Sequence, residues 1–442
     1  MSRAPRTEHA AADSAPPPLP WPARSRLLRS LAHANFRRYY IGQLVSLNGT
    51  WMQQVAQSWL LYRLTESSLM LGLAGAATLA PSLVLGLYGG VLADKLSRRR
   101  LMIAAQALAM VQALVLGILT LGGWVVPWHV LALALLLGMV QAFELPARHS
   151  LVAALVPREA LSNAVALNSS SFHLARFIGP AIAGALVAWA GEGPVFLLNA
   201  LTFVAVLGAL TSLRLPAPAG DGAGPHPRGL GAGLRYAWDH AQIRAALVMV
   251  AMASVFGAST IVLMPVFAVE VFGRGPQSLG ALMGALGAGA LVGALTLARR
   301  GGVIGLERVI AVAALIGGLA LGAFALTDRL WLGLVILPLV GFNVTTLMAS
   351  SNAFIQLTVP DALRGRVMAL FSVALHGCMP IGHLAVGGAA EWLGAPRTVA
   401  TCALVLAAAG LVFRARVRPS DPPPQSQPRS ANDTGSPSPT TK

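Results

Sequence analysis

The chain has few charged residues for its length. Of its 442 residues, 11% are Asp, Glu, Lys or Arg and 55% are hydrophobic, whereas a soluble protein carries roughly 25% charged residues. Five stretches contain no charged residue at all, namely 101–143, 245–269, 275–298, 330–360 and 367–390. Each is long enough for a membrane-spanning helix of about 20 residues. The composition therefore excludes a soluble enzyme, a disordered protein and a nucleic-acid-binding protein, and indicates a polytopic helical membrane protein.

Cysteine, lysine and the common catalytic motifs are scarce as well. Cys378 and Cys402 both lie in apolar runs, so no disulfide framework is expected. Neither Lys95 nor Lys442 belongs to a GxxxxGK[ST] loop, which excludes direct use of ATP. The sequence has no Cys/His cluster with metal-ligand spacing and no GxSxG motif. We therefore expect no cofactor, no metal site and no catalytic residues, and hence not an intramembrane enzyme.

The charge that is present follows a topological pattern. The net charge is +16, and nearly all of the positive charge is arginine. Most Lys and Arg residues lie in segments on the side that both termini share, whereas the opposite segments hold four, Arg63, Arg274, Arg329 and Arg397. Because positive residues concentrate in cytoplasmic loops, both termini are expected to be cytoplasmic.

Apolar segments predict twelve spans. They cover residues 37–62, 69–93, 101–122, 125–147, 160–190, 194–213, 244–270, 277–298, 304–326, 329–352, 365–391 and 395–415. A Gly/Pro-rich stretch at 216–233 divides them six and six. The predicted fold class is an all-α polytopic membrane protein with twelve transmembrane helices in two six-helix bundles.

The same pattern predicts the domain organisation. The two bundles are expected at 35–213 and 244–415, joined by a cytoplasmic central loop at 214–243. The low-complexity tails at 1–34 and 416–442 are expected to be disordered and cytoplasmic.

The two bundles are related by an internal repeat. A shift of 203 residues aligns several identical residues, among them Gly90 with Gly293, Val156-Pro157 with Val359-Pro360, His173 with His376, Gly179 with Gly382 and Trp189 with Trp392. Parallel repeats of six helices are an architecture of rocker-switch transporters.

The loop after the second span carries a recognisable motif. Residues 90–100 read GVLADKLSRRR, which is either a basic cytoplasmic loop or a signature. The run resembles the pattern GxxxD[RK]xGR[RK] of the major facilitator superfamily, with Ser97 in place of the second Gly. In that superfamily the loop latches the two halves in one state, so the resemblance implies that Gly90, Asp94, Lys95 and Arg98 are gating residues.

Further segments resemble one branch of this superfamily, that of the enterobactin exporter and related secretion permeases. They are FELPAR at 143–148, LVP at 155–157 and VPDALRGRV at 359–367, and the likeness extends over residues 35–415. Glu144 stands where Asp is expected. Gly179 and Pro180 also resemble the end of the GPxxGG motif of antiporters, although these residues could equally permit a kink and tight packing. The resemblance implies an exporter.

Polar residues inside the spans are the candidate substrate contacts. They are Asn48, Gln53, Gln54 and Gln57 in the first span and Asn343 and Thr346 in the tenth. Amides and hydroxyls in a span face water, a ligand or another helix. The resemblance places the first and tenth spans at the central cavity and so implies substrate binding, with helix packing as the alternative.

Charged and titratable residues supply the remaining candidates. Arg176 lies within the fifth span, where a charge costs about 2.5–3.5 kcal/mol. It is expected to bind an anionic substrate or a carboxylate, or else to anchor neighbouring helices or snorkel to the membrane surface. His173 and His376 occupy equivalent positions, and histidine titrates near pH ~6.5. With Glu144 they are the candidates for proton coupling, the alternative for the histidines being neutral hydrogen bonding.

These features together predict a secondary active transporter. It would export a small organic molecule, siderophore-like or an amphipathic drug, by alternating access, driven by the proton gradient as an antiporter. An importer with the same fold, or a non-transporting sensor or assembly protein, are the alternatives. The expected partners are the lipid bilayer and the substrate, and a monomer is compatible with the sequence. High Ala, Gly and Arg content with little Lys points to a GC-rich bacterium and its inner membrane.

Overall fold

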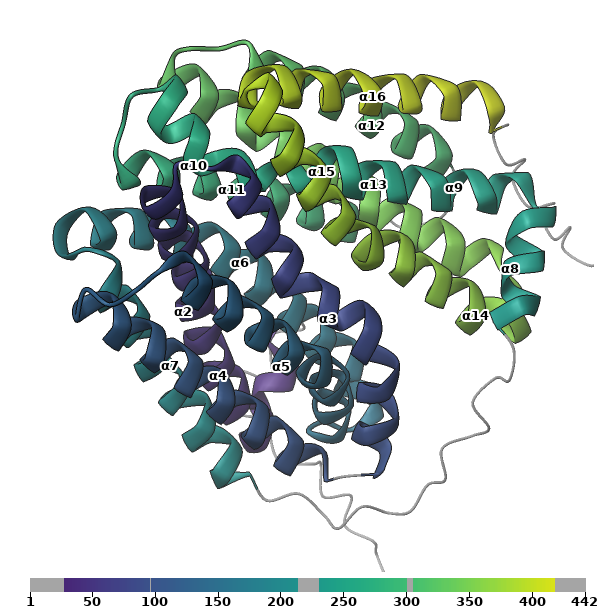
Figure 1. The fold of residues 1–442 in the computed structure, drawn as a ribbon. Coiled ribbons are helices and arrows are strands. Elements are labelled where there is room, and N and C mark those ends of the chain that lie inside the picture. The colour runs from purple at the N-terminus through teal and green to yellow at the C-terminus, as the bar shows by residue number, and fades with distance from the viewer. Residues whose placement is uncertain (1–27, 96, 214–229, 300–304, 418–442) are drawn as a thin grey trace, which may run out of the picture. The chain divides into compact units, whose positions relative to one another are not determined.

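Helices account for all regular structure in the described part of the chain. The computed structural model describes residues 28–95, 97–213, 230–299 and 305–417, and every element assigned there is helical (Figure 1). Most of the two expected tails and residues 214–229 of the expected central loop lie outside these ranges. Eleven helical segments are long and apolar enough to cross a membrane.

The first half contains one helix for each expected span. After the short 3₁₀ helix η1 (Arg29–Ala32) come α2 (Ala34–Thr65), α3 (Ser68–Lys95), α4 (Arg98–Leu121), α5 (Pro127–Ala154), α6 (Arg158–Ala190) and α7 (Glu192–Ser212). Helix α2 is not among the eleven apolar segments, because its Asn and Gln residues lower its hydropathy. Its 32 residues nevertheless exceed the ~20 needed to span a bilayer, so it is the twelfth.

The second half repeats this order with two interrupted spans. Its elements are α8 (Leu230–Asp239), α9 (Ala241–Met252), η2 (Ala253–Gly257), η3 (Ala258–Leu263), α10 (Met264–Val266), η4 (Phe267–Val271), α11 (Pro276–Arg299), α12 (Leu306–Ala325), α13 (Leu330–Thr358), α14 (Asp361–Ser372), η5 (Val373–Gly377), α15 (Cys378–Leu393) and α16 (Ala395–Arg416). The expected spans 244–270 and 365–391 contain π-helical turns, and the first also a 3₁₀ turn. Helix α8 was not expected, since it lies in the predicted central loop.

The helices form two compact units. One contains Met1–Leu60 and Pro81–Gly224, and the other contains Leu61–Ala80 and Pro225–Lys442. The division falls inside α2 and α3, so the end of α2 and the start of α3 pack with the second unit. Each unit has its own buried core, with Phe36 and Phe203 in the first and Phe354 and Phe413 in the second.

Small residues allow close helix packing in the second unit. A Cβ at Gly289 of α11 would overlap the carbonyl oxygen of Pro338 in α13, and one at Gly341 would overlap that of Leu286. Helices α12 and α16 run side by side (Figure 1) and approach closely at Gly318. Such small-residue contacts are the usual basis of helix association in membranes, because lipid provides no hydrophobic driving force.

Candidate functional site

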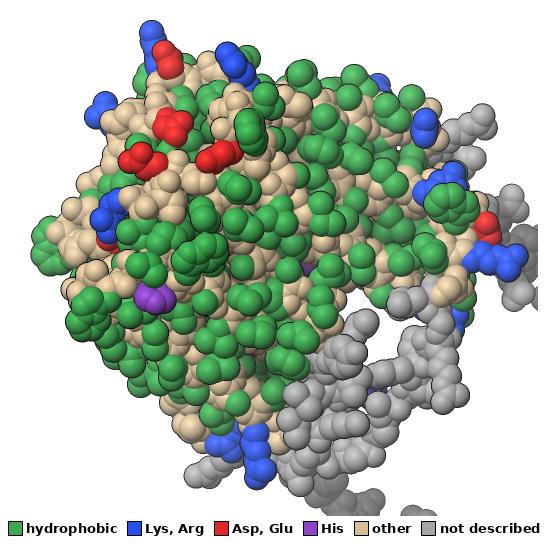
Figure 2. Space-filling view, viewed as in Figure 1, with side chains coloured by type: hydrophobic (Ala, Val, Ile, Leu, Met, Phe, Trp, Pro, Cys, Tyr) green, Lys and Arg blue, Asp and Glu red, His purple; other side chains and the backbone are tan. Residues whose placement is uncertain are grey.

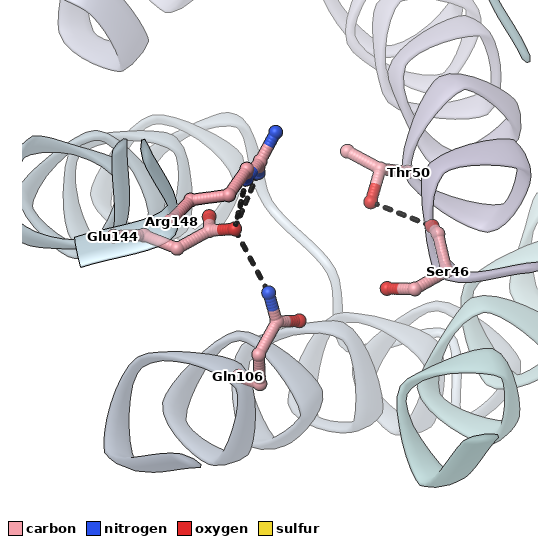
Figure 3. Close-up of polar contacts among 5 residues, drawn as sticks. All are labelled: Ser46, Thr50, Gln106, Glu144 and Arg148. Atoms are coloured by element: carbon pink, nitrogen blue, oxygen red, sulfur yellow. Dashed lines mark hydrogen bonds and ion pairs between the residues drawn. The ribbon is translucent and has the colours of Figure 1, made fainter. Parts of the chain in front are cut away.

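A buried ion pair lies in the interior of the first unit. The Glu144 Oε1 of α5 accepts hydrogen bonds from Gln106 Nε2 of α4 at 2.9 Å and from Arg148 Nε at 3.2 Å, and it is also bonded to Arg148 Nη2. Figure 3 shows the hydroxyls of Ser46 and Thr50, on α2, across the space into which Arg148 and Gln106 point. The carboxylate is compensated by a charge and an amide, as a buried charge must be.

Tyr39 adds a further polar group to this ion pair. Its side chain is 1% exposed, and its hydroxyl has no hydrogen-bond partner among the described residues. The hydroxyl interacts electrostatically with both Arg148 and Glu144. Helices α2, α4 and α5 therefore bring a carboxylate, a guanidinium, an amide and a phenol together. Of these four groups, Glu144 was named as a candidate in the sequence analysis. The i, i+4 spacing of Glu144 and Arg148 was the sequence signal that could have predicted the ion pair.

Gln53 belongs to a second polar group, a chain of amides. Its Nε2 donates to Gln112 Oε1 of α4 at 2.9 Å, and its Oε1 accepts from Asn199 Nδ2 of α7 at 2.7 Å. Thr202 Oγ1 donates to Asn199 Oδ1 at 3.0 Å. All of these bonds connect helices to one another or lie within α7, which matches the packing alternative for Gln53. Its role as a substrate contact stays a prediction.

The other amides of α2 have different surroundings. Gln54 is exposed and Gln57 is half-buried. Asn48 donates from Nδ2 to the Leu44 carbonyl oxygen at 2.8 Å, and its Oδ1 is buried with no hydrogen-bond partner among the described residues. Of the four candidate amides of α2, Gln53 is hydrogen-bonded at both its nitrogen and its oxygen, whereas Asn48 has an unbonded oxygen among the described residues and Gln54 and Gln57 are at least partly exposed.

Arg176 lies in an aromatic setting on the adjoining faces of α2 and α6. Its guanidinium carbon is 5.7 Å from the centroid of the Trp51 ring, and Trp51 in turn meets Phe172 edge-on at 5.6 Å. Gly179 permits this approach, because a Cβ there would lie 2.7 Å from Trp51 Cβ. No described residue forms an ion pair with Arg176. Beside it, half-buried His173 stacks edge-on with Phe172, and its Nδ1 has no partner in the described ranges.

The candidates in the second unit lie in three different surroundings. Asn343 is buried and donates to the Leu339 carbonyl oxygen at 2.8 Å, on the side of α13 that faces Gly317 of α12. Thr346 is buried near Gly293 of α11. His376 lies in the π-helical turn η5 and is exposed. The two equivalent histidines therefore differ, since His173 is half-buried in a regular α-helix.

The predicted gating residues are only partly described. Gly90, Asp94 and Lys95 belong to the last turns of α3. The surroundings of Gly90 and of the Asp94 and Lys95 side chains lie outside the described part of the structure. Arg98 is the first residue of α4 and is exposed. Ser97, which departs from the superfamily pattern, caps α4 by accepting a hydrogen bond from the Arg100 amide. The departure from glycine thus has a local structural function.

Two more carboxylates bind the segment Leu61–Ala80 to the rest of the second unit. Glu391 of α15 accepts from the Ser67 hydroxyl at 3.1 Å and from the Leu69 amide at 3.0 Å, and so caps the start of α3. Glu270 accepts a hydrogen bond from the Tyr62 hydroxyl. Across the ranges that the structure describes, no three His, Cys, Asp or Glu side chains are grouped to bind a metal ion.

Solved structures with this arrangement of helices are membrane transporters. A bacterial homologue of the human lysosomal transporter Spinster has a TM-score of 0.68 at 13% identity, over 88% of this chain and 98% of that chain. The nucleoside transporter NupG has a TM-score of 0.66 at 13% identity, over 86% and 98%. The likeness to these structures shows the fold, a polytopic bundle of membrane helices.

The chain belongs to the transmembrane secretion effector family of the major facilitator superfamily, whose profile matches residues 26–433. Similar proteins include a staphyloferrin A transporter of Staphylococcus aureus (24% identical, covering 83% of this chain and 92% of the relative) and the multidrug efflux pump Tap of Mycolicibacterium fortuitum (27%, 83% and 92%). The enterobactin exporter EntS of Shigella flexneri is 27% identical over 83% and 87%. The protein is thus a multi-pass membrane transporter and not an enzyme, and the predicted fold class and superfamily are confirmed.

Proposed function

We propose that this transporter exports an anionic organic molecule with aromatic or amphipathic character by alternating access. The observation that carries the proposal is Arg176, a guanidinium within a span that stacks on Trp51 and lacks a carboxylate partner among the described residues. Stacking on the ring leaves guanidinium N–H groups free to bind carboxylate or phenolate oxygens. Phe172 extends the same surface with an apolar ring.

The relatives support export and a siderophore-like substrate. Two are named for staphyloferrin A and enterobactin, and a third for multidrug efflux. A siderophore with acidic iron-binding groups would match the charge of Arg176. A cationic drug would instead be repelled by it, so the anionic molecule is the first candidate and the amphipathic drug the second.

The coupling we propose is proton antiport through Glu144. Its carboxylate accepts hydrogen bonds from both Arg148 and Gln106, and its protonation would release the arginine for another anion. His173 lies beside Arg176 and is the second candidate, while His376 is exposed on the second unit. Asp94 and its loop remain the proposed cytoplasmic gate, with both termini cytoplasmic, in the inner membrane, and a monomer as the simplest assembly.

The first experiment is to compare metabolites in culture supernatants and cell extracts by mass spectrometry. Deletion and overexpressing strains are grown with and without iron. We expect one anionic compound to fall outside and accumulate inside the deletion strain, more so under iron starvation. Accumulation outside the deletion strain would show import, and unchanged metabolites in all four conditions would remove a dedicated export role.

Variants then connect the compound to the site. Arg176→Gln is expected to raise the KM for export at least tenfold, with Arg176→Lys in between, whereas Arg158→Gln on the exposed start of the same helix leaves it unchanged. Collapse of the proton gradient is expected to stop export. Continued export in the presence of the uncoupler, or a Glu144→Gln variant with normal proton-driven export, would contradict the antiport mechanism.

A further inference from the structure

Helix α8 (Leu230–Asp239) lies where two membrane spans begin. A single residue, His240, separates it from α9, and α9 begins the apolar run Ala241–Val271. One side of α8 packs on α14. The approach is so close that a Cβ at Gly233 would lie 2.6 Å from Arg366 Cβ. Arg366 is in the second turn of the other run, Asp361–Leu393. Two spans therefore fix the level of α8 at a boundary between the apolar core of the membrane and water.

The neighbouring side of α8 is apolar and uncovered. Leu234 and Trp238 are one helical turn apart and are 56% and 69% exposed. Gly233 and Ala237 are by contrast buried. Figure 2 shows hydrophobic side chains next to Lys and Arg side chains in the region that α8 occupies in Figure 1. An exposed Trp next to a Leu at this level fits the aromatic belt of a membrane interface.

Arginines flank the apolar strip. The Arg244 guanidinium carbon lies 5.6 Å from the centroid of the Trp238 ring, and Arg244 donates a hydrogen bond to the Trp238 carbonyl oxygen. Arg235 is exposed, and its only ion pair among the described residues is a long one of 3.9 Å to exposed Asp239. Arg366 of α14 is half-buried at the contact with Gly233 of α8. The guanidinium groups of Arg235 and Arg244 thus lie beside the strip, with one acidic side chain, Asp239, on α8 itself.

We propose that α8 lies in the headgroup layer of the bilayer and binds anionic phospholipid. Leu234 and Trp238 enter the boundary of the acyl chains, while Arg235 and Arg244 bind phosphodiester groups. An amphipathic helix binds a membrane surface through apolar burial and attraction of its cations to anionic lipid. A lipid surface is the occupant because the strip is level with the starts of two spans and its charge complements phosphate.

Spin labels at two positions of α8 test the placement. The full-length chain, with Cys378→Ser and Cys402→Ala, receives a nitroxide at Leu234→Cys or at the matched position Ala232→Cys, which is also exposed. In nanodiscs that contain phosphatidylglycerol, we expect oxygen to relax the label at 234 at least threefold more than a water-soluble nickel complex does. The label at 232 should show the opposite preference. A label at 234 that prefers the nickel complex would overturn membrane docking and favour a protein partner.

Titration with phosphatidylglycerol tests the choice of lipid. Native mass spectrometry is used to compare its affinity for the unmodified chain, the Arg235→Gln/Arg244→Gln variant and the control Arg397→Gln, an exposed arginine at the start of α16. We expect affinity to fall about fivefold for each of the two arginines removed and to be unchanged in the control. Equal affinity in all three proteins, or the same label burial in phosphatidylcholine discs, would overturn the assignment to anionic lipid.

Discussion

The two units differ in the chemistry of their interiors. In the first, Gln53, Gln112 and Asn199 form a chain of amides across three helices, and Glu144, Arg148 and Gln106 form an ion-pair cluster. The positions 203 residues later hold Phe256, Leu315 and Cys402 for the amides and Leu347, Ser351 and Val309 for the cluster. At Gly289 and Gly341 the helices of the second unit approach one another backbone to backbone.

This difference shows that the two halves of the repeat share the lengths of their helices but not these buried polar side chains. Helices α5, α6 and α7 and their counterparts α13, α14–α15 and α16 begin 203 residues apart. A unit of this architecture can therefore form without a buried Glu–Arg pair at these positions. Because the second unit lacks the Glu144–Arg148 pair, the fold does not require the pair, which favours a role in transport.

The largest expected effect comes from breaking the ion pair on one side. Arg148→Ser leaves the Glu144 carboxylate buried without its cation, at a cost of about 3–5 kcal/mol. The double change Glu144→Leu/Arg148→Ser supplies the residues of the second unit and should recover most of the stability. Melting temperatures of the purified full-length chain are the measurement, and a double variant as unstable as the single would refute the equivalence.

A glycine contact in the second unit should have the next largest effect. Gly289→Val places a side chain against the Pro338 backbone, which cannot retreat as a flexible side chain would, so we expect a loss of about 3 kcal/mol. Gly388→Val is the control, because a Cβ there would meet only Leu69 Cδ1, at 3.8 Å. Similar melting temperatures for the two variants would show that close packing of α11 and α13 is not what stabilises this unit.

The amide chain of the first unit can be broken in the same graded way. Gln53→Leu leaves Gln112 and Asn199 each without one buried partner and should cost about 1–2 kcal/mol. The triple change Gln53→Phe/Gln112→Leu/Asn199→Cys reproduces the residues of the second unit and should be less destabilising than the single change. Additive losses across the three positions would contradict the idea that the amides mainly satisfy one another.

Helix capping gives the smallest expected effect. Ser97 caps α4 with its side chain, whereas α12 begins after Gly305, which has a left-handed conformation and no side-chain cap. Ser97→Ala should cost about 0.5–1 kcal/mol, and Ser97→Gly only a few tenths. Thermal unfolding at matched detergent concentration would show which of the two variants is less stable. An equal loss of stability for Ala and Gly would argue against a capping role.

Much of the helical framework was predictable because apolar length alone determines a span. Residues 329–352 and 395–415 were predicted close to α13 and α16. Helix α8 was missed because its ten residues follow a Gly/Pro-rich stretch and are too few for a span. The partners of individual side chains were also beyond sequence reasoning, since Gln53 meets an amide 146 residues away. Arg176 was identified by its charge in a span, but its stacking on Trp51 depends on how α2 and α6 pack at Gly179.

The amides of α2 have a consequence for how the protein is inserted into the membrane during its synthesis. Helix α2 is the first span to leave the ribosome, and it is the one that falls short of the hydropathy of the other eleven. Its buried Gln53 reaches its partners only after 59 and 146 further residues have been made. Transfer of an amide without hydrogen-bond partners from the insertion machinery into lipid is energetically unfavourable. We therefore expect α2 to complete its insertion only after α4 and α7 have been made, so that membrane integration of this half is cooperative rather than sequential.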